Sequence, residues 1–249
     1  MQVTAYKTPK IKANDDLYKI LDECLPKLEE ASIVSITSKI IALCQGDVIK
    51  NDGTVDKRAL IKQEADWYIE DPNLDQFGTL IITIKEDILI ANAGIDESNA
   101  DGYFVLWPKN IQTTIIKVWN YLKQKHSVEN LGIIFTDSRL TPLRWGLQGV
   151  GIAWCGFSAI NDYVGKPDIF GRELKMSKES ILDGLSAASV VLMGEGNEQT
   201  PLVVIQDVPF VQFQDHPPTE KEKQDMRIKK EEDIYGKLLN SVKWQKGGK

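Results

Sequence analysis

Three short acidic clusters stand out in this sequence because each follows or joins an apolar segment. They are Asp96 in NAGIDESN, Asp137 with Ser138 in FTDS, and Glu195 in MGEGNEQTP. Carboxylates and a hydroxyl from separate loops are usual oxygen ligands of magnesium or manganese, which normally also hold substrate phosphates. The combination predicts phosphoryl chemistry. Any one of these acids taken alone is more typical of a turn beside glycine, where Asp and Asn are favoured.

Other kinds of catalytic site are not indicated. The sequence has no GxxxxGKS/T phosphate loop, and Gly149-Val150-Gly151 lacks the third glycine of a dinucleotide-binding fingerprint. Its two histidines are His126 and His216, which argues against a Ser-His-Asp site or a histidine-rich zinc site. Its three cysteines lie far apart without a CxxC motif, so we expect reduced thiols. Chemistry is therefore expected to rest on carboxylates, lysines and bound ions.

Length and charge limit the class of protein. The chain has 249 residues, 42% of them hydrophobic, which is enough for one domain or two intimate lobes. The N-terminus lacks an apolar signal region, and no window approaches the roughly 18 apolar residues that span a membrane. The net charge is −6 without a long basic cluster, so nucleic acid is not expected as a partner. We expect a cytoplasmic protein that does not bind membranes.

Apolar runs and helical spacing predict a mixture of strands and helices. Strands are predicted at residues 3–6, 33–37, 79–84, 88–91, 131–135 and 201–206. Helices are predicted at residues 15–25, 55–69, 111–122 and 177–193. The cluster Asp71-Pro72-Asn73 is expected to end the second helix, and Ser177 to be the N-cap of the fourth. The pattern alone supports only the mixing of α and β elements.

The polar segments between these elements locate the expected site. Residues 92–108 are rich in Gly, Asn, Asp and Ser and predict a functional loop. The run Thr136-Asp137-Ser138-Arg139 directly follows the predicted strand at 131–135, and sites in open α/β sheets lie beyond the carboxyl ends of strands. Residues 215–249 hold nine basic and seven acidic residues. They predict a solvated tail with one amphipathic helix at 234–242.

Six segments occur in an order that resembles the F-420-0:gamma-glutamyl ligase family. They are KIKANDDL, SITSKIIALCQG, NAGIDESN, FTDSRLTPLRWG, YVGKPDIFGREL and MGEGNEQTP. The resemblance covers most of the chain before the tail. It implies an α+β fold with mainly antiparallel sheets, a two-lobed catalytic domain at residues 1–214 and a charged tail at 215–249. It also implies a homodimer.

The resemblance implies a site and a reaction. Asp96, Asp137, Ser138 and Glu195 would surround Mg²⁺ or Mn²⁺ at the phosphates of GTP or ATP. Asp137 and Arg144 would be catalytic, with Arg144 holding a carboxylate or the transferred phosphoryl group. The terminal phosphoryl group would pass to an acceptor carboxylate, and the amine of L-glutamate would attack the acyl phosphate. The nucleotide would be lined by Thr8, Pro9, Lys10, Ile11, Ser38, Lys39, Asn99, Met193, Gly194, Gly196 and Asn197.

Departures from the family pattern affect the expected acceptor. The first of two arginines that usually follow the family's aspartate is missing, and Leu43 and Gln45 stand where a lysine and an acid are usual. The segments TPLRWG and GYFVLWP look more like a branch associated with folate metabolism, so we expect a folate or pterin carboxylate as acceptor. F-420-0 is the alternative acceptor, and a non-catalytic nucleotide-binding module is the alternative class. Trp107, Trp145 and Trp154 are candidates for stacking on a pterin or for the core.

Overall fold

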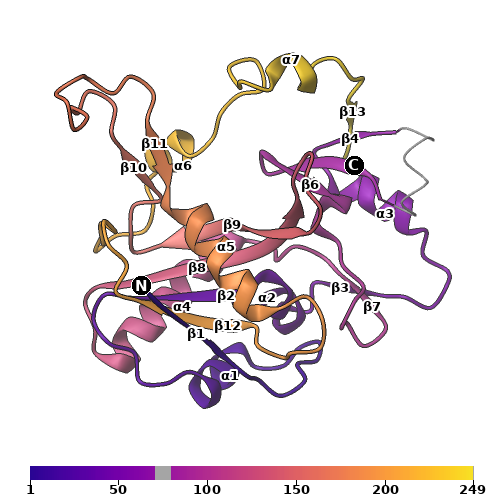
Figure 1. Ribbon diagram of the computed structural model, residues 1–249. Coiled ribbons are helices and arrows are strands. Elements are labelled where there is room, and N and C mark those ends of the chain that lie inside the picture. The colour runs from indigo at the N-terminus through magenta and orange to yellow at the C-terminus, as the bar shows by residue number, and fades with distance from the viewer. Residues whose placement is uncertain (71–79, 249) are drawn as a thin grey trace.

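The main sheet has five strands and carries most of the buried core (Figure 1). The computed structural model describes residues 1–70 and 80–248. The strand order is β1 (Gln2–Tyr6), β12 (Leu202–Gln206), β2 (Ser32–Thr37), β8 (Leu131–Leu140) and β9 (Leu147–Cys155). Neighbouring strands are antiparallel except β2 and β8, which are parallel. The predicted α+β class with mainly antiparallel sheets is confirmed.

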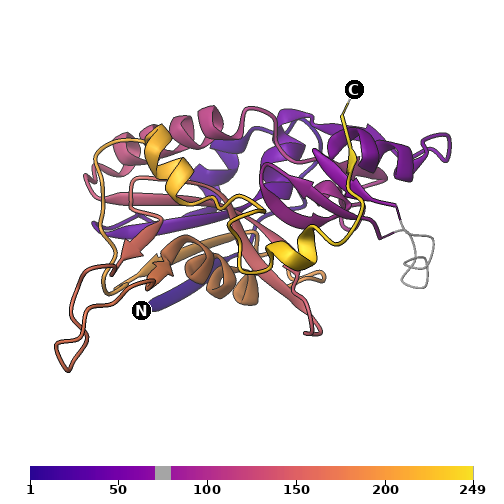
Figure 2. The same ribbon diagram turned by 90° about the horizontal axis from the view of Figure 1, so that it is seen from above.

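Helices cover both faces of this sheet, and Figure 2 shows α4 and α5 on opposite sides. One face packs against α1 (Leu17–Cys24), α2 (Ser38–Gln45) and α4 (Ile111–His126). The other packs against α5 (Ile181–Met193). The central strand β2 has the sequence SIVSIT and is buried at all but its last residue, as expected for a strand covered on both faces.

A second group of strands forms beside the main sheet. Its order is β13 (Gln245–Lys246), β4 (Trp67–Ile69), β5 (Ile82–Lys85) and β6 (Ile88–Ala91). The helix α3 (Lys57–Glu64), the turn η2 (Asn92–Gly94) and the pair β3 (Val48–Lys50) and β7 (Tyr103–Val105) complete this part. Leu60, Ile61 and Phe104 share its small core. Its importance is that η2 and the following loop bring Asp96 and Trp107 to the main sheet.

The C-terminal segment returns across the molecule to this second group of strands (Figure 1). It contains α6 (Glu220–Asp225) and α7 (Gly236–Leu239), and it ends in β13, which pairs with β4. Arg227 also forms an ion pair with Asp87 at 3.1 Å. The segment is therefore bound to the body of the protein, and the helix expected at 234–242 is shorter. The division of the chain at residue 214 stays a prediction.

Several predicted boundaries are wrong, and among them the helix expected at 111–122 continues to His126. The helix expected at 55–69 ends at Glu64, because residues 67–69 pair with β5 and β13. The strand expected at 131–135 continues to Leu140, because β9 pairs with it along its whole length. The helix expected from Ser177 begins at Ile181, with Ser180 as its N-cap, because residues 178–180 form β11 against β10 (Ile160–Asp162).

Further boundaries are closer to the sequence pattern. The loop expected at 92–108 contains η2 and β7. The predicted end of the second helix at Asp71-Pro72-Asn73 and the predicted start of the strand at Thr79 lie outside the described residues.

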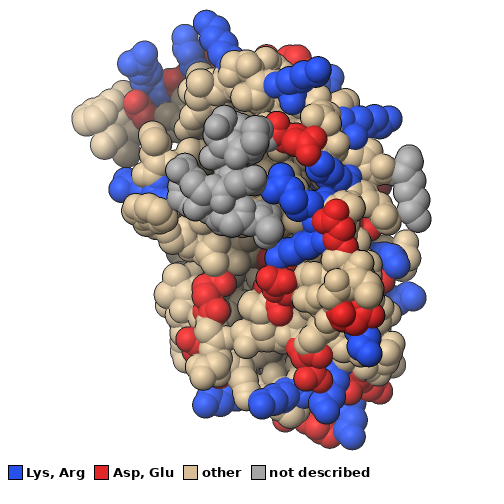
Figure 3. Space-filling model, turned by 90° about the vertical axis from the view of Figure 1, so that its right-hand side faces the viewer, with Lys and Arg blue, Asp and Glu red and all other residues tan. Residues whose placement is uncertain are grey.

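No helix of the described chain combines the length and the apolar character needed to cross a membrane. On the face shown in Figure 3, acidic and basic side chains are interspersed.

Candidate active site

A cavity of about 570 Å³ lies where β2, β8, the loop after η2 and the loop after α5 meet. All predicted metal-site and nucleotide-site residues line it. They come from Thr8–Ile11, the start of α2, the segment Asp96–Asn99, β8, and Met193–Asn197. The prediction that these distant segments form one site therefore agrees with the fold. The individual roles of these residues stay predictions.

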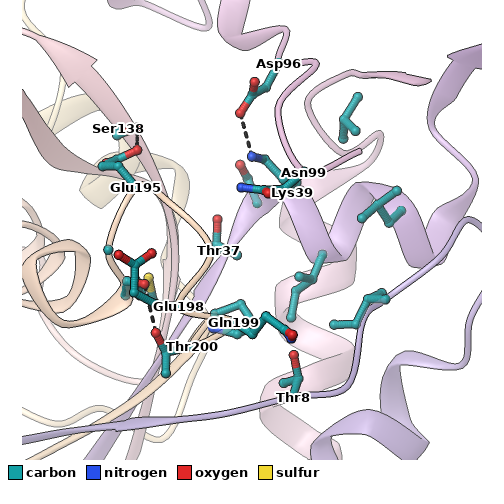
Figure 4. Close-up of a pocket in the computed structure, with 18 of the residues that line it drawn as sticks. Thr8, Thr37, Lys39, Asp96, Asn99, Ser138, Glu195, Glu198, Gln199 and Thr200 are labelled. Carbon is teal, nitrogen blue, oxygen red and sulfur yellow. Dashed lines mark hydrogen bonds and ion pairs between the residues drawn. The ribbon is translucent and has the colours of Figure 1, made fainter. Parts of the chain in front are cut away.

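Lys39 and Asp96 form the ion pair at one side of the cavity, and Figure 4 shows them close together. The Lys39 Nζ atom is 2.6 Å from Asp96 Oδ2 and donates to the Ser98 carbonyl at 3.1 Å. Asp96 also accepts from the Ser98 backbone N–H at 2.8 Å. The Asp96 pKa is lowered: burial acts to raise it, but the Lys39 charge and these hydrogen bonds outweigh that effect. Asp96 is therefore held as a carboxylate.

Asp137 is the most strongly perturbed acid of the cavity. It lies within β8 and accepts hydrogen bonds from the Trp107 indole N–H and, at 2.8 Å, from the Ser138 backbone N–H. Burial raises the pKa of Asp137 to about 6, and the charge of Asp96 adds to this effect, whereas the two hydrogen bonds oppose it. A perturbed carboxylate in a cavity is a typical feature of a functional site.

Glu195 lies opposite, in the loop that follows α5. Ser138 Oγ donates to Glu195 Oε2 at 3.5 Å, as Figure 4 shows. Burial raises the pKa of Glu195, with smaller contributions from the charges of Asp96 and Glu198. The acids of the cavity therefore repel one another. Added positive charge would relieve this repulsion.

The loop at residues 194–197 offers backbone amides to the cavity. The Gly196 N–H donates to Glu198 Oε2 at 2.9 Å, so this loop already binds a carboxylate oxygen. Asn99 Nδ2 donates to the Gly196 carbonyl at 2.7 Å and ties the loop to the Asp96 segment. Gly194 has φ of 73°, a conformation that favours glycine. Amides presented in this way also suit phosphate oxygens.

Arg144 lies apart from the cavity. It is exposed in the turn between β8 and β9 and does not line the cavity with the other predicted residues. Its neighbours Leu143 and Trp145 are almost fully exposed as well. The fold explains this placement, because β8 and β9 extend as a hairpin beyond the acids. Within one chain, the structure does not support the predicted contact of Arg144 with a carboxylate at this site.

Several cavity residues were not predicted from the sequence. They are Lys12, Thr37, Ile40, Leu43, Gly94, Asp101, Thr136, Glu198, Gln199 and Thr200, among others. Glu198, Gln199 and Thr200 belong to the MGEGNEQTP segment, so that motif contained the signal. Trp107 was considered for stacking, whereas its indole N–H binds Asp137. That pairing joins residues 30 apart in sequence, and local patterns do not reveal it.

The donor types of the site fit a hard divalent cation, although the side chains are not gathered tightly. In the described residues, no group of three or more His, Cys, Asp or Glu side chains is close enough to hold a metal. Asp96, Asp137, Glu195 and the Ser138 hydroxyl nevertheless supply oxygen donors only, which is the preference of Mg²⁺ and Mn²⁺. The raised pKa values of Asp137 and Glu195 also indicate a place where a cation is favourable.

Acids, a lysine and a glycine-containing loop around one cavity are typical of an enzyme that handles phosphoryl groups. Comparison with known proteins identifies the family. The sequence profile of F420-0:Gamma-glutamyl ligase matches residues 5–207. The chain belongs to this family and is an amide-bond-forming gamma-glutamyl ligase, as the motifs predicted.

Three relatives illustrate the similarity, and each is a coenzyme F420:L-glutamate ligase. The protein of Methanococcus maripaludis strain C7 is 30% identical over 94% of this chain and 97% of its own length. That of Methanocaldococcus jannaschii is 31% identical over 74% of this chain and 79% of its own length. That of Methanopyrus kandleri is 29% identical over 78% and 82%. None of these three names supports a folate-type acceptor, so that expectation stays untested.

Proposed function

We propose that this protein joins L-glutamate to F420-0 or a closely similar acceptor carboxylate, with hydrolysis of GTP or ATP. The supporting observation is that the cavity gathers Asp96, Asp137, Ser138, Glu195 and the glycine-containing loop in a member of this ligase family. The relatives that share most of the chain are F420:L-glutamate ligases. They favour F420-0 over the folate or pterin acceptor as the first candidate.

The proposed reaction has two steps. An oxygen of the acceptor carboxylate attacks the terminal phosphorus of the nucleotide, and the bond to the nucleoside diphosphate breaks. The glutamate amine then attacks the carbonyl carbon of the acyl phosphate, the C–O bond to phosphate breaks, and the amine loses a proton. Free carboxylates do not condense with amines favourably in water, so this activation supplies the driving force.

The side chains of the cavity have distinct roles in this proposal. The loop amides at 194–197 and Lys39 bind and orient the phosphates. Asp96, Asp137, Ser138 and Glu195 would hold Mg²⁺ or Mn²⁺, which offsets negative charge on phosphate oxygens. Trp107 fixes the Asp137 carboxylate by its hydrogen bond. Positioning and charge stabilisation account for the catalysis, without a covalent enzyme intermediate.

We also propose that the protein is a homodimer in the cytoplasm. Two projecting segments carry exposed apolar side chains, which supports a contact with a second copy. The β8–β9 turn exposes Leu143 and Trp145, and the segment between β10 and β11 exposes Ile169 and Phe170. Figure 1 shows the second segment extending far from the body.

The test is a product assay on the purified protein. The mixtures contain Mg²⁺ or Mn²⁺, GTP or ATP, L-glutamate, and in separate reactions F420-0, dihydropteroate or tetrahydrofolate. We expect phosphate release that requires both acceptor and glutamate, and one added glutamate on F420-0 by mass spectrometry. The Asp137→Asn variant should lose turnover by at least about 100-fold, since it removes a charge from the reacting centre.

The other outcomes are equally informative. Glutamate added to a pterin acceptor instead would restore the folate assignment. Nucleotide binding without any glutamate transfer would leave a non-catalytic binding module. Full metal-dependent activity of Asp137→Asn would remove this residue from the site.

A further inference from the structure

Lys85 is a buried lysine to which the proposed reaction assigns no role. It is the last residue of β5 and is 9% exposed, and it is the single lysine that the fold buries among the described residues. Lysine is almost never buried without a charged partner. Here the partner is Glu64 at the end of α3, whose Oε2 atom is 3.0 Å from Lys85 Nζ.

Stability alone does not account for this buried ion pair. Taking two charges out of water is costly, and their attraction often does no more than offset that cost. Two apolar side chains of similar size would join α3 to β5 at least as well. The groups beside Lys85 indicate a different role for the pair.

The Lys85 ammonium group also lies over the ring of Trp107. The Nζ atom is 5.9 Å from the ring centroid, a distance at which a cation is attracted by the face of an indole. The N–H of the same indole donates to the Asp137 carboxylate. The positive charge at the ring draws electron density away from the N–H and makes it a better donor, as in other linked polar groups. Glu64, Lys85, Trp107 and Asp137 therefore form one continuous series of contacts.

The backbone that carries Trp107 is fixed separately by Asp47, which is 7% exposed. The Leu106 N–H donates to the Asp47 carbonyl at 3.1 Å, and the Lys109 N–H donates to Asp47 Oδ2 at 2.9 Å. These bonds hold the chain on both sides of Trp107. The orientation of the indole within this frame is left to the groups around its ring, and Lys85 is one of them.

We propose that Lys85, held by Glu64, is a positioning residue that orients the Trp107 indole toward Asp137. This inference rests on the proposed function, because Asp137 belongs to the site of that reaction. Neither Lys85 nor Glu64 lines the cavity, so the pair acts through Trp107 and not on the substrates. The second group of strands thereby contributes to the reaction from outside the cavity.

The experiment replaces the ion pair by apolar side chains in the double variant Lys85→Met with Glu64→Leu. The urea midpoint should equal or exceed that of the wild type. We expect kcat to fall about five- to tenfold through loss of the cation at the ring, with the KM for nucleotide and glutamate within about twofold. Lys85→Arg should keep most of kcat, because arginine also pairs with carboxylates and stacks on aromatic rings. In Trp107→Phe, the same double substitution should lower kcat little further.

Lys62→Met is the matched control on α3. Lys62 forms an ion pair with Glu70, and its Nζ atom is 5.5 Å from the centroid of the Tyr68 ring. The Tyr68 hydroxyl donates to Gln245 Oε1 at 2.9 Å, at the contact between β4 and β13. This variant removes a lysine from the same kind of arrangement and should keep the kcat of the wild type.

Nuclear magnetic resonance tests the geometry without catalysis. The protein is labelled on the tryptophan indole nitrogens, and the Trp107 signal is assigned by its absence in Trp107→Phe. We expect this signal to move toward its position in the urea-unfolded protein in the variant Lys85→Met with Glu64→Leu, and to stay in place in Lys62→Met. A moved signal in a protein that transfers no glutamate would support the positioning role and reject the proposed function. An unmoved signal would overturn the inference, and so would full turnover of the double variant.

Discussion

The contact between Trp107 and Asp137 is the most specific interaction of the candidate active site. The indole N–H donates to the carboxylate, whose pKa burial raises to about 6. Hydrogen bonds to charged groups are stronger than neutral ones and fix geometry. Trp107 is buried, so its ring also belongs to the core. Its effects on stability and on turnover can be separated.

We predict that Trp107→Phe lowers turnover at least about tenfold and destabilises the protein by about 1.5–3 kcal/mol, since it leaves Asp137 without its indole donor. The matched control is Trp119→Phe, because the Trp119 indole N–H donates to the buried Leu131 carbonyl at 2.7 Å, away from the cavity. That variant should lose comparable stability and keep its turnover per folded molecule. Equal loss of activity in the two variants would show that Trp107 acts only through the core.

Gly94 fixes the position of the same indole. A Cβ atom at Gly94 would lie 2.0 Å from Trp107 Nε1, and Gly94 has φ of +72°. Gly102 has φ of +84° with nothing within 4 Å of its Cβ position. Substitutions at these two glycines therefore separate two contributions to the loss of stability. Gly102 measures the cost of the left-handed backbone alone, and Gly94 adds the cost of the clash with Trp107.

We predict that Gly102→Ala destabilises the protein by about 1 kcal/mol through the backbone alone. Gly94→Ala should cost about 2–5 kcal/mol, because overpacking adds to that strain, and it should also lower turnover by displacing Trp107. Urea unfolding and glutamate-transfer assays measure the two effects. Similar stability and activity of the two variants would contradict the clash.

At the scale of elements, the end of α4 depends on the protonation state of His126. The His126 Nδ1 atom accepts from the Leu28 backbone N–H at 3.1 Å and joins α4 to the segment after α1. Burial lowers the pKa of His126 below its ordinary 6.5, and the charges of Lys125 and Lys27 lower it further, whereas Asp22 opposes them. A proton on Nδ1 would remove this acceptor.

We predict that the protein loses stability as pH falls below 6.5, the ordinary pKa of histidine, partly through His126. The pKa in the folded state is lower than in the unfolded chain, so the unfolded chain takes up the proton first as pH falls. The contribution is complete above the unfolded value and is lost as pH falls below it. His126→Asn keeps an acceptor without titration, so its urea midpoint should fall less over this range. Equal falls in both proteins would exclude this contribution.

The helices and many of the strands were predictable from the sequence, and most of the missed strands are very short. Apolar runs located β1, β2, β6 and β12 to within a residue or two, because each buries its side chains in a sheet. The short strands β3, β4, β7, β10, β11 and β13 were not predicted, and each contains at most three residues and depends on a partner elsewhere in the chain. The nine-residue strand β9 (Leu147–Cys155) was not predicted either. The sequence pattern predicted that Trp67 to Ile69 continue the preceding helix. They form a strand instead, because they pair with β5 and β13.

The site residues that could be predicted from the sequence are those that belong to the family motifs. Asp96, Asp137, Ser138 and Glu195 were identified from their segments, and all line one cavity. The role of Arg144 stays a prediction, and within one chain this residue lies apart from the cavity because the β8–β9 hairpin extends beyond the acids. Tertiary pairing therefore limits what a motif can assign.

At the scale of the whole molecule, two projecting segments remain without contacts that would bury their apolar side chains. Trp145 is 95% exposed in the β8–β9 turn, and Phe170 is 88% exposed between β10 and β11. Single exposed apolar residues are normal, but several large ones on two projections are typical of an interface. Aromatic side chains also contribute most to binding energy at the centres of interfaces. In the proposed homodimer, a second copy of the chain would cover these exposed side chains.

We predict that the wild-type protein elutes as a dimer in size-exclusion chromatography with light scattering. The double variant Leu143→Ser with Trp145→Ser should dissociate at concentrations at least about tenfold higher, because truncating interface aromatics commonly costs more than 1 kcal/mol. The control is Ile234→Ser with Leu238→Ser, which removes exposed apolar side chains from the C-terminal segment and should leave the dimer intact. A monomeric wild-type protein at all concentrations would refute the dimer. Equal weakening by both double variants would place the interface over the C-terminal segment as well.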